Sequence, residues 1–265
     1  MTADGRYAVA ACGDCTLKVW DLKNETAWAL RTLQGHASIV GCVAITADGR
    51  RAASASNDNT VKVWDLENGS ALRTLEGHAG AVFGVAVSAD GRRAVSASRD
   101  STLKVWDMEN GTALRTLRGH TSWVNRVVMT GDGRVAVSAS SDGTLKVWDL
   151  ESGSVLRTLE GHTGCVAGVA ADGLRAVSAS EDKTLKVWDL ESGNVIATFT
   201  CDAAAMCCAF AGPRVIVAGD ATGQVHFLSL ELPGPSSSES VDGVWLIREL
   251  GSVRNSWSFK SKAAH

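Results

Sequence analysis

One short sequence recurs along the chain at almost constant spacing. The pentapeptide LKVWD, or its variant VKVWD, places a tryptophan at positions 20, 64, 106, 148 and 188, so the spacings are 44, 42, 42 and 40 residues. Gly-His occurs at 35–36, 77–78, 119–120 and 161–162, and an aspartate stands six residues before each repeated tryptophan. A fixed period of this size predicts a repeat architecture in which each copy packs on its neighbours.

Each repeat reads as four short strands. In the second copy these are 38–46, 50–56, 60–66 and 71–75, which are rich in small and β-branched residues and are separated by turns that contain glycine. The first two are joined by Ala-Asp-Gly, a typical hairpin sequence. A single sheet of this kind cannot bury both of its faces, so the copies are predicted to stack on one another.

The copy at 161–189 lacks two residues between its Gly-His and its Asp-Gly turn, compared with the copy at 77–107. Because side chains alternate between the two faces of a strand, an even deletion keeps every remaining residue on its own face. We therefore expect a shortened strand with the same faces inward and outward.

The sequence CGDC at 12–15 has the spacing of a zinc or redox motif. Laid over the third copy, however, Cys12 falls on Ser98 and Cys15 on Ser101, which flank a tight hairpin turn. A zinc site also needs two further ligands at matching spacing, and the neighbouring sequence has none. We interpret CGDC as part of a hairpin, and expect no metal and no cofactor.

Composition limits the classes of partner and compartment. The net charge of −3, with 21% charged residues, leaves no dominant sign for nucleic acid or an acidic membrane. No apolar run is long enough to span a membrane, and residues 1–14 have no signal-peptide pattern. Seven scattered cysteines are typical of free thiols in a reducing compartment. We expect a cytoplasmic protein.

The Gly-His, the turn aspartate and the WD dipeptide together resemble the WD-repeat β-propeller family over residues 1–230. The resemblance implies an all-β propeller of about six four-stranded blades, either complete or part of a seven-bladed or larger ring. Blade one is partial (1–33), blades two to five span 38–199, and a degenerate blade six spans 201–230. Residues 207–231 also look like the closing blade of propellers in bacterial signal-transduction ATPases, where the propeller acts as a sensor or an autoinhibitory domain.

Residues 231–265 form a Pro/Ser linker and a tail. Within the tail, 244–250 reads as the outer strand of blade six, and 252–260 reads either as an inner strand of blade one that closes the ring or as a disordered segment. We expect a monomer if the ring is closed and self-association if it is open, since open sheet edges and apolar faces attract partners.

In WD-repeat proteins a histidine, a serine or threonine, the turn aspartate and the tryptophan form a hydrogen-bonded tetrad within a blade. The serine is one of two in each copy, and the sequence leaves this choice open. In blade six, Asp202 aligns with the histidine, Asp220 keeps the turn position and His226 replaces the tryptophan, so the tetrad is broken there. The tetrad residues implied by the resemblance are His36, Asp58 and Trp64; His78, Asp100 and Trp106; His120, Asp142 and Trp148; and His162, Asp182 and Trp188, with Ser54 or Ser56, Ser96 or Ser98, Ser138 or Ser140, and Ser178 or Ser180.

Partners of the family usually bind the face where the inner strands begin, which we call the top face. The strongest candidates are Phe83 and Trp123 as apolar anchors, Arg99 and Glu181 as charge selectors, and Asn125, because exposed aromatic and arginine side chains dominate protein interfaces. The alternative is that Phe83 and Trp123 only fill gaps between blades. The corresponding top-face positions are Ile39, Gly41 and Asn57; Ala81, Phe83 and Arg99; Trp123, Asn125 and Ser141; and Cys165, Ala167 and Glu181.

Other functions fit the residues less well. Serine, histidine and aspartate recur once per copy and always with the tryptophan, which is typical of a scaffold and not of a catalytic triad. An enzyme that uses the central funnel would need converging acids, histidines or metal ligands on the inner strands. Arg31, Arg73, Arg115 and Arg157 could form a nucleic-acid track, but acidic residues alternate with them. We predict a non-enzymatic scaffold or sensor that binds a protein or peptide, with no nucleic acid and no membrane as partner.

Overall fold

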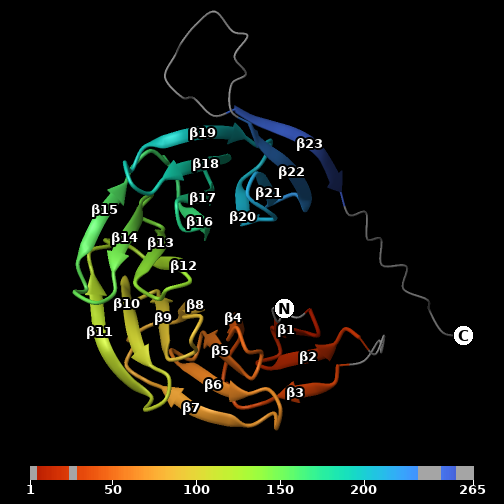
Figure 1. Cartoon of the computed structure of the whole chain (residues 1–265), viewed down its shortest axis with the longest axis vertical. Coiled ribbons are helices and arrows are strands. Elements are labelled where there is room, and N and C mark those ends of the chain that lie inside the picture. The colour runs from red at the N-terminus through yellow and green to blue at the C-terminus, as the bar shows by residue number, and fades with distance from the viewer. Residues whose placement is uncertain (1–4, 24–28, 232–245, 255–265) are drawn as a thin grey trace, which may run out of the picture.

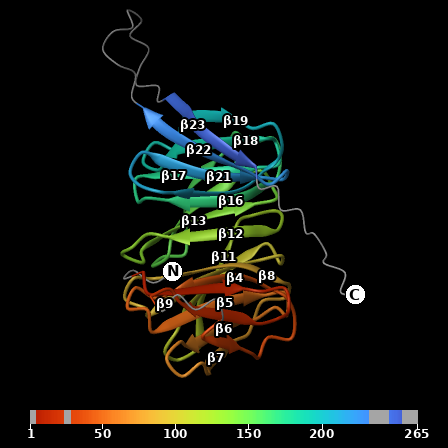
Figure 2. The ribbon, with the colours of Figure 1, turned by 90° about the vertical axis from the view of Figure 1, so that its right-hand side faces the viewer.

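The structure is a computed structural model that describes residues 5–23, 29–231 and 246–254. Its regular elements are antiparallel β-strands in six sheets, which are arranged as blades around a common centre (Figure 1). Seen edge-on, the sheets stack as successive layers (Figure 2). The chain is therefore all-β with about six blades, as the repeat predicts. No helix long and apolar enough to cross a membrane occurs in the described ranges.

Within every blade the strands follow one another in chain order. Blade one contains β1 (Tyr7–Ala11), β2 (Leu17–Asp21) and β3 (Arg31–Leu33). Blades two and three contain β4 (Val40–Ile45), β5 (Arg51–Ser56), β6 (Val61–Asp65) and β7 (Ala71–Leu75), followed by β8 (Val82–Val87), β9 (Arg93–Ser98), β10 (Thr102–Asp107) and β11 (Thr112–Arg118). Blades four and five contain β12 (Val124–Met129), β13 (Val135–Ser140), β14 (Leu145–Asp149) and β15 (Val155–Leu159), followed by β16 (Val166–Ala171), β17 (Arg175–Ser180), β18 (Thr184–Asp189) and β19 (Val195–Thr200). Blade six contains β20 (Ala205–Phe210), β21 (Val215–Asp220), β22 (Gln224–Glu231) and β23 (Leu246–Arg254).

The hydrophobic core lies between neighbouring blades. Val61, Val63 and Leu75 of blade two, for example, form one buried cluster with Val82 and Trp106 of blade three. The four tryptophans at 64, 106, 148 and 188 are at most 1% exposed. Burying a side chain of this size contributes roughly 4–6 kcal/mol of transfer free energy. Because the facing surfaces of consecutive blades cover each other, the stacking that the repeat predicts is the main source of stability.

Neighbouring inner strands approach each other closely. A Cβ added at Gly84 of β8 would lie 3.2 Å from the Cα of Arg126 on β12, and one at Gly168 of β16 would lie 3.2 Å from the Cα of Cys207 on β20. Backbone atoms set these limits, so no side-chain rotation relieves them. Glycine at 84 and 168 allows the inner strands to converge on the centre.

The two-residue deletion in blade five lies in a turn and not in a strand. β16 has six residues, as β8 does, whereas the turn that follows is shortened from 88–92 to 172–174. The expected shortening of the strand is therefore wrong, while the inward and outward faces are kept as expected. The turn absorbs the change because the strands are packed on both sides.

The outer strand of blade six comes from the C-terminal part of the chain. β23 pairs with β22 from Leu246 opposite Glu231 to Arg254 opposite Gln224. The pairing continues beyond residue 250, so residues 252–254 of the segment considered for the inner strand of blade one belong to β23 instead. Residues 244–245 and 255–260 lie outside the described residues. The described residues do not show the ring closing between blades one and six (Figure 1).

Candidate functional site

A hydrogen-bonded tetrad occupies blade two and recurs in blades three to five. His36 Nδ1 lies 2.7 Å from Asp58 Oδ2, and His36 Nε2 lies 2.7 Å from Ser54 Oγ. Trp64 Nε1–H donates to Ser54 Oγ at 2.8 Å. The serine of each tetrad is therefore the first of the two candidates, and the corresponding contacts in the other blades are made by Ser96 with His78, Asp100 and Trp106; Ser138 with His120, Asp142 and Trp148; and Ser178 with His162, Asp182 and Trp188.

The electrostatics of the tetrad fix its protonation. Burial acts to raise the pKa of Asp58, but hydrogen bonds from Thr60, the Ala37 amide and His36 outweigh it and hold the pKa at about 2. Burial lowers the pKa of His36, against the opposing effect of Asp58. A neutral imidazole beside a carboxylate donates a hydrogen bond from Nδ1, so its Nε2 is an acceptor. His36 Nε2 therefore accepts a hydrogen bond from the Ser54 hydroxyl, and the Ser54 oxygen accepts one from the indole N–H of Trp64. The polar atoms of the His36, Ser54 and Trp64 side chains all have hydrogen-bond partners within the tetrad. The tetrad therefore has a structural role.

Blade six replaces the tetrad with a different network. His226 is buried, with Nε2 3.3 Å from Asp220 Oδ2 and Nδ1 3.0 Å from Glu249 Oε1. Its ring also makes an edge contact with Phe199 of blade five, at a centroid distance of 5.6 Å. Asp202, which aligns with the tetrad histidines, is exposed. His226 therefore links three strands, β21, β22 and β23.

Cys12 and Cys15 lie in or beside the turn between β1 and β2. Cys15 adopts a φ of 67°, and Ser101, its counterpart in blade three, adopts 66°. Both cysteines are free thiols. The turn geometry agrees with the interpretation of CGDC as part of a hairpin. Within the described ranges, no three His, Cys, Asp or Glu side chains gather as a group that could hold a metal ion.

A shallow depression of about 500 Å³ lies on the top face, at the beginning of the inner strands. Ten of the twelve top-face positions named from the sequence line it, and Ala81 and Arg99 do not. Sequence reasoning missed Arg126 and Met206. The lining residues are Ile39, Gly41, Asn57, Phe83, Trp123, Asn125, Arg126, Ser141, Cys165, Ala167, Glu181 and Met206.

Three side chains of blades three and four form a stack at the edge of this depression. The guanidinium carbon of Arg99 lies 4.3 Å from the centre of the Trp123 ring, which is the geometry of a cation–π contact. The rings of Phe83 and Trp123 are 6.2 Å apart and tilted by 56°. Trp123 nevertheless stays 44% exposed. Arg99 thus touches the site through Trp123, although it does not line the depression.

The Asn125 side chain is held in place by polar atoms of blades four and five. Its Nδ2 donates to the Val166 carbonyl at 2.9 Å and to Ser141 Oγ at 3.0 Å, and lies 3.3 Å from Cys165 Sγ. Asn125 therefore ties blade four to blade five. These contacts give it a structural role at the rim that the sequence does not reveal.

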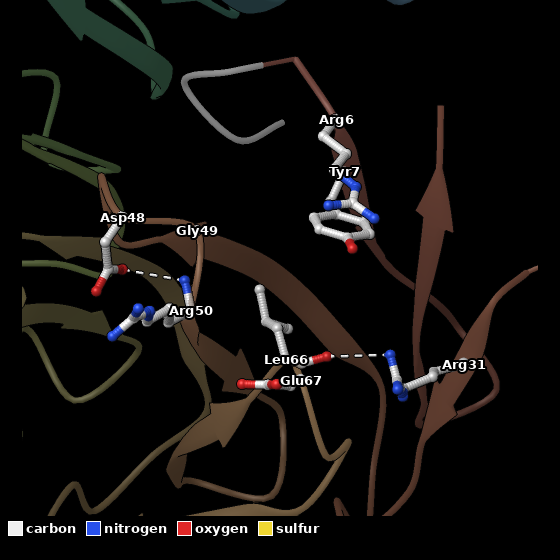
Figure 3. A pocket seen from close by; sticks show the side chains of 8 residues that line it. All are labelled: Arg6, Tyr7, Arg31, Asp48, Gly49, Arg50, Leu66 and Glu67. Carbon is white, nitrogen blue, oxygen red and sulfur yellow. Dashed lines mark hydrogen bonds between the residues drawn. The ribbon is translucent and has the colours of Figure 1, made fainter. Parts of the chain in front are cut away.

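A second depression, of about 470 Å³, lies between blades one and two near the opposite end of β4 (Figure 3). Arg6, Tyr7 and Arg31 line it from blade one, and Asp48, Gly49, Arg50, Leu66 and Glu67 line it from blade two. Arg31 Nη1 donates to the Leu66 carbonyl at 3.4 Å.

Arg31 belongs to the ring of arginines that the sequence offered as a nucleic-acid track. Its Cδ lies 3.1 Å from the position of a Cβ at Gly69, where φ is +73°. Arg73, Arg115 and Arg157 make equivalent approaches to Gly111, Gly153 and Gly193 at 3.2–3.4 Å. This recurring packing supports a structural role for the four arginines.

Comparison with known families agrees with this architecture. Residues 6–228 match the sequence profile of a family described as the TEP-1 second beta-propeller. No curated protein was found to match the chain. The match covers blades one to five and most of blade six, and the tetrads within it are those typical of WD repeats. Because the match extends over most of its length, the chain belongs to the family of TEP-1 second beta-propeller domains.

Proposed function

We propose that this propeller is a non-catalytic interaction module that binds a peptide or protein segment on its top face, across blades three to five. A propeller is a rigid support, and its function depends on the side chains that it presents. Trp123 and Phe83 serve as apolar anchors, and Arg99 and Glu181 select the charge of the partner. The observation that carries the proposal is the exposure of Trp123 within a fixed stack at the edge of a depression.

The stack supports binding for an energetic reason. An indole that only filled a gap between blades would be buried, as the four tetrad tryptophans are, whereas Trp123 is 44% exposed. Arg99 and Phe83 hold its ring in one orientation, so little side-chain entropy is lost when a partner covers it. Pre-ordered aromatic side chains in a central depression are typical binding hot spots.

The setting that we propose is cytoplasmic signalling. The support for it is the resemblance of residues 207–231 to the closing blade of propellers in bacterial signal-transduction ATPases, together with the free cysteines. In that setting the propeller is a sensor or autoinhibitory domain of a larger protein, and its top face holds the segment that it senses.

The test is a peptide-display selection against the wild-type chain, followed by fluorescence anisotropy with the selected peptides. Trp123→Ala is expected to weaken their binding by about tenfold or more. Leu156→Ala is the matched control, since Leu156 is a similarly exposed apolar residue (51%) on the outer strand β15. Unchanged affinity in Trp123→Ala, or equal losses in both variants, would place binding elsewhere and refute the proposal.

A further inference from the structure

The inner strands of blades two to six each have a bulge near their beginning, and the residue that follows the bulge occupies an equivalent position in every blade. These residues pair with equivalent positions on the second strands of their blades, and they are Cys42, Gly84, Arg126, Gly168 and Cys207. Four of them are glycine or cysteine. Arg126 is the exception, a long cationic side chain at the level where the inner strands converge, and it is exposed. A residue that departs from a repeated packing rule in this way indicates a functional position.

The hydrogen-bond donors of Arg126 are only partly used. Its Nη1 donates to the Phe83 carbonyl at 2.6 Å and lies 3.4 Å from the Asn125 carbonyl. Among the described residues, Nε and Nη2 have no partner and the guanidinium makes no ion pair. By contrast, Arg93 pairs with Glu151, and Arg175 with Asp172. A ligand that covers Arg126 must supply acceptors, because a desolvated charge without a partner is costly.

The surroundings of Arg126 define what that ligand carries. Phe83 and Trp123 line the depression from blades three and four, and Ile39 and Met206 add exposed apolar surface from blades two and six. The Phe83 contact fixes one edge of the guanidinium and leaves the other for a planar anion. A carboxylate matches the spacing of guanidinium donors. An apolar side chain next to that carboxylate then reaches the Phe83 and Trp123 rings.

The geometry points to an acidic peptide segment as the occupant: the carboxylate of an aspartate or glutamate on Arg126, with a neighbouring aromatic or aliphatic side chain against Phe83 and Trp123. This inference rests on the proposed function and specifies its partner. Glu181 lines the same depression, so a dianionic phosphate is disfavoured there relative to a singly charged carboxylate. Arg99 contributes to the positive side through its position over Trp123.

The experiment uses the full chain and synthetic fluorescein-labelled peptides with a Gly/Ser background. Each peptide carries a phenylalanine and, at varied spacing from it, glutamate, glutamine, phosphoserine or lysine. Fluorescence anisotropy at low and high salt gives the affinities. Arg126→Met keeps an unbranched, mainly apolar stem and removes the charge, and Arg126→Lys restores the charge without the planar fork. Arg118→Met, an exposed arginine at the end of β11, is the matched control.

The expected result is tightest binding of a glutamate peptide, by about tenfold over its glutamine twin, with a preference that weakens at high salt. Arg126→Met should lower the glutamate affinity to the glutamine level, Arg126→Lys should keep part of the preference, and Arg118→Met should keep all of it. The glutamate preference of the wild-type chain is measured without any variant, so a poorly folded Arg126→Met still leaves a decisive result.

Two different failures can be told apart. If peptides bind in a Trp123-dependent way but glutamate has no advantage, or phosphoserine or lysine binds better, the inference is wrong while the proposed function stands. The inference is equally wrong if Arg126→Met keeps the glutamate preference. If none of these peptides binds while peptides from the display selection bind in a Trp123-dependent way, the inference is wrong and the proposed function stands. If the selected peptides fail as well, or binding does not depend on Trp123, both the proposed function and the inference are wrong.

Discussion

Ser54 Oγ lies 2.8 Å from the indole nitrogen of Trp64 and 2.7 Å from His36 Nε2, so one hydroxyl satisfies two buried groups. Ser54 itself has no exposed surface. Removing its oxygen leaves a donor and an acceptor without partners in a region that water does not reach. An unsatisfied buried group costs about 1–3 kcal/mol.

We therefore expect Ser54→Ala to lower the free energy of unfolding by about 2 kcal/mol or more, measured by urea denaturation. Ser70→Ala is the control, because Ser70 is exposed and its hydroxyl has no hydrogen-bond partner among the described residues; it should change the free energy by less than about 0.5 kcal/mol. Equal effects of the two substitutions would contradict the role assigned to Ser54.

The tetrads also predict how stability depends on pH. Burial lowers the folded-state pKa of His36, His78, His120 and His162 below 6.5. The unfolded chain therefore binds more protons as the pH falls, and the free energy of unfolding decreases. This stability is fully present above about pH 6.5 and is lost as the pH falls through the lowered values.

The tetrad aspartates extend the same trend to lower pH. Burial opposes the shift, but hydrogen bonds hold the pKa of Asp58, Asp100, Asp142 and Asp182 at about 2, against 3.8 for the unfolded chain. A second loss of stability is expected between about pH 4 and pH 2. Urea denaturation from about pH 8 down to about pH 3 follows the histidine loss and the onset of the aspartate loss. A free energy of unfolding that stays flat or rises on acidification would refute this assignment.

The close approach of the inner strands gives a third prediction. In Gly84→Ala the new Cβ would lie 3.2 Å from the Arg126 Cα and 3.3 Å from the Val127 amide nitrogen, so backbone has to move. We expect a loss of about 1–3 kcal/mol in the free energy of unfolding.

Gly131→Ala serves as the control for Gly84→Ala, because a Cβ at Gly131 meets nothing within 4 Å and the backbone there is not left-handed. Its thermal midpoint should stay close to that of the wild-type chain. If Gly131→Ala lowered the thermal midpoint as much as Gly84→Ala does, the loss of a glycine, and not the contact with β12, would be the cause of the destabilisation.

The network around His226 predicts where blade six opens first. Glu249 of β23 lies 3.0 Å from His226 Nδ1 and is the side-chain contact that joins β23 to the buried imidazole. Glu249→Ala should raise amide hydrogen exchange in β23 and β22 while β14 and β15 stay protected.

Arg248→Ala is the matched control on the same strand, since Arg248 is exposed and its side chain makes no hydrogen bond among the described residues. Exchange in β23 should be close to that of the wild-type chain. If both variants open β23 equally, the His226–Glu249 contact does not hold the strand.

Much of this protein follows from its sequence because the repeat is local and periodic. Each unit carries its own strand pattern, turn residues and tetrad positions. The resemblance of these units to WD repeats therefore implies the tetrads without any knowledge of long-range contacts in this chain. The top-face positions implied by the family resemblance follow in the same way, since they stand at fixed offsets from the Gly-His histidine or directly before the turn aspartate. The repeats also predicted that the two-residue deletion in blade five would leave the faces unchanged.

Only the tertiary structure decided the rest. Ser54 and Ser56 lie on the same face of β5 and are both fully buried; the sequence cannot separate them, because the choice depends on which hydroxyl the indole of the next strand reaches. Arg126 escaped notice because the bulge between Val124 and Arg126 interrupts the alternation of side chains. The extent of β23 was likewise decided by pairing: residues 252–254 continue along the edge of β22. In each case the deciding contact joins residues from different strands or blades, which a repeating local pattern does not encode.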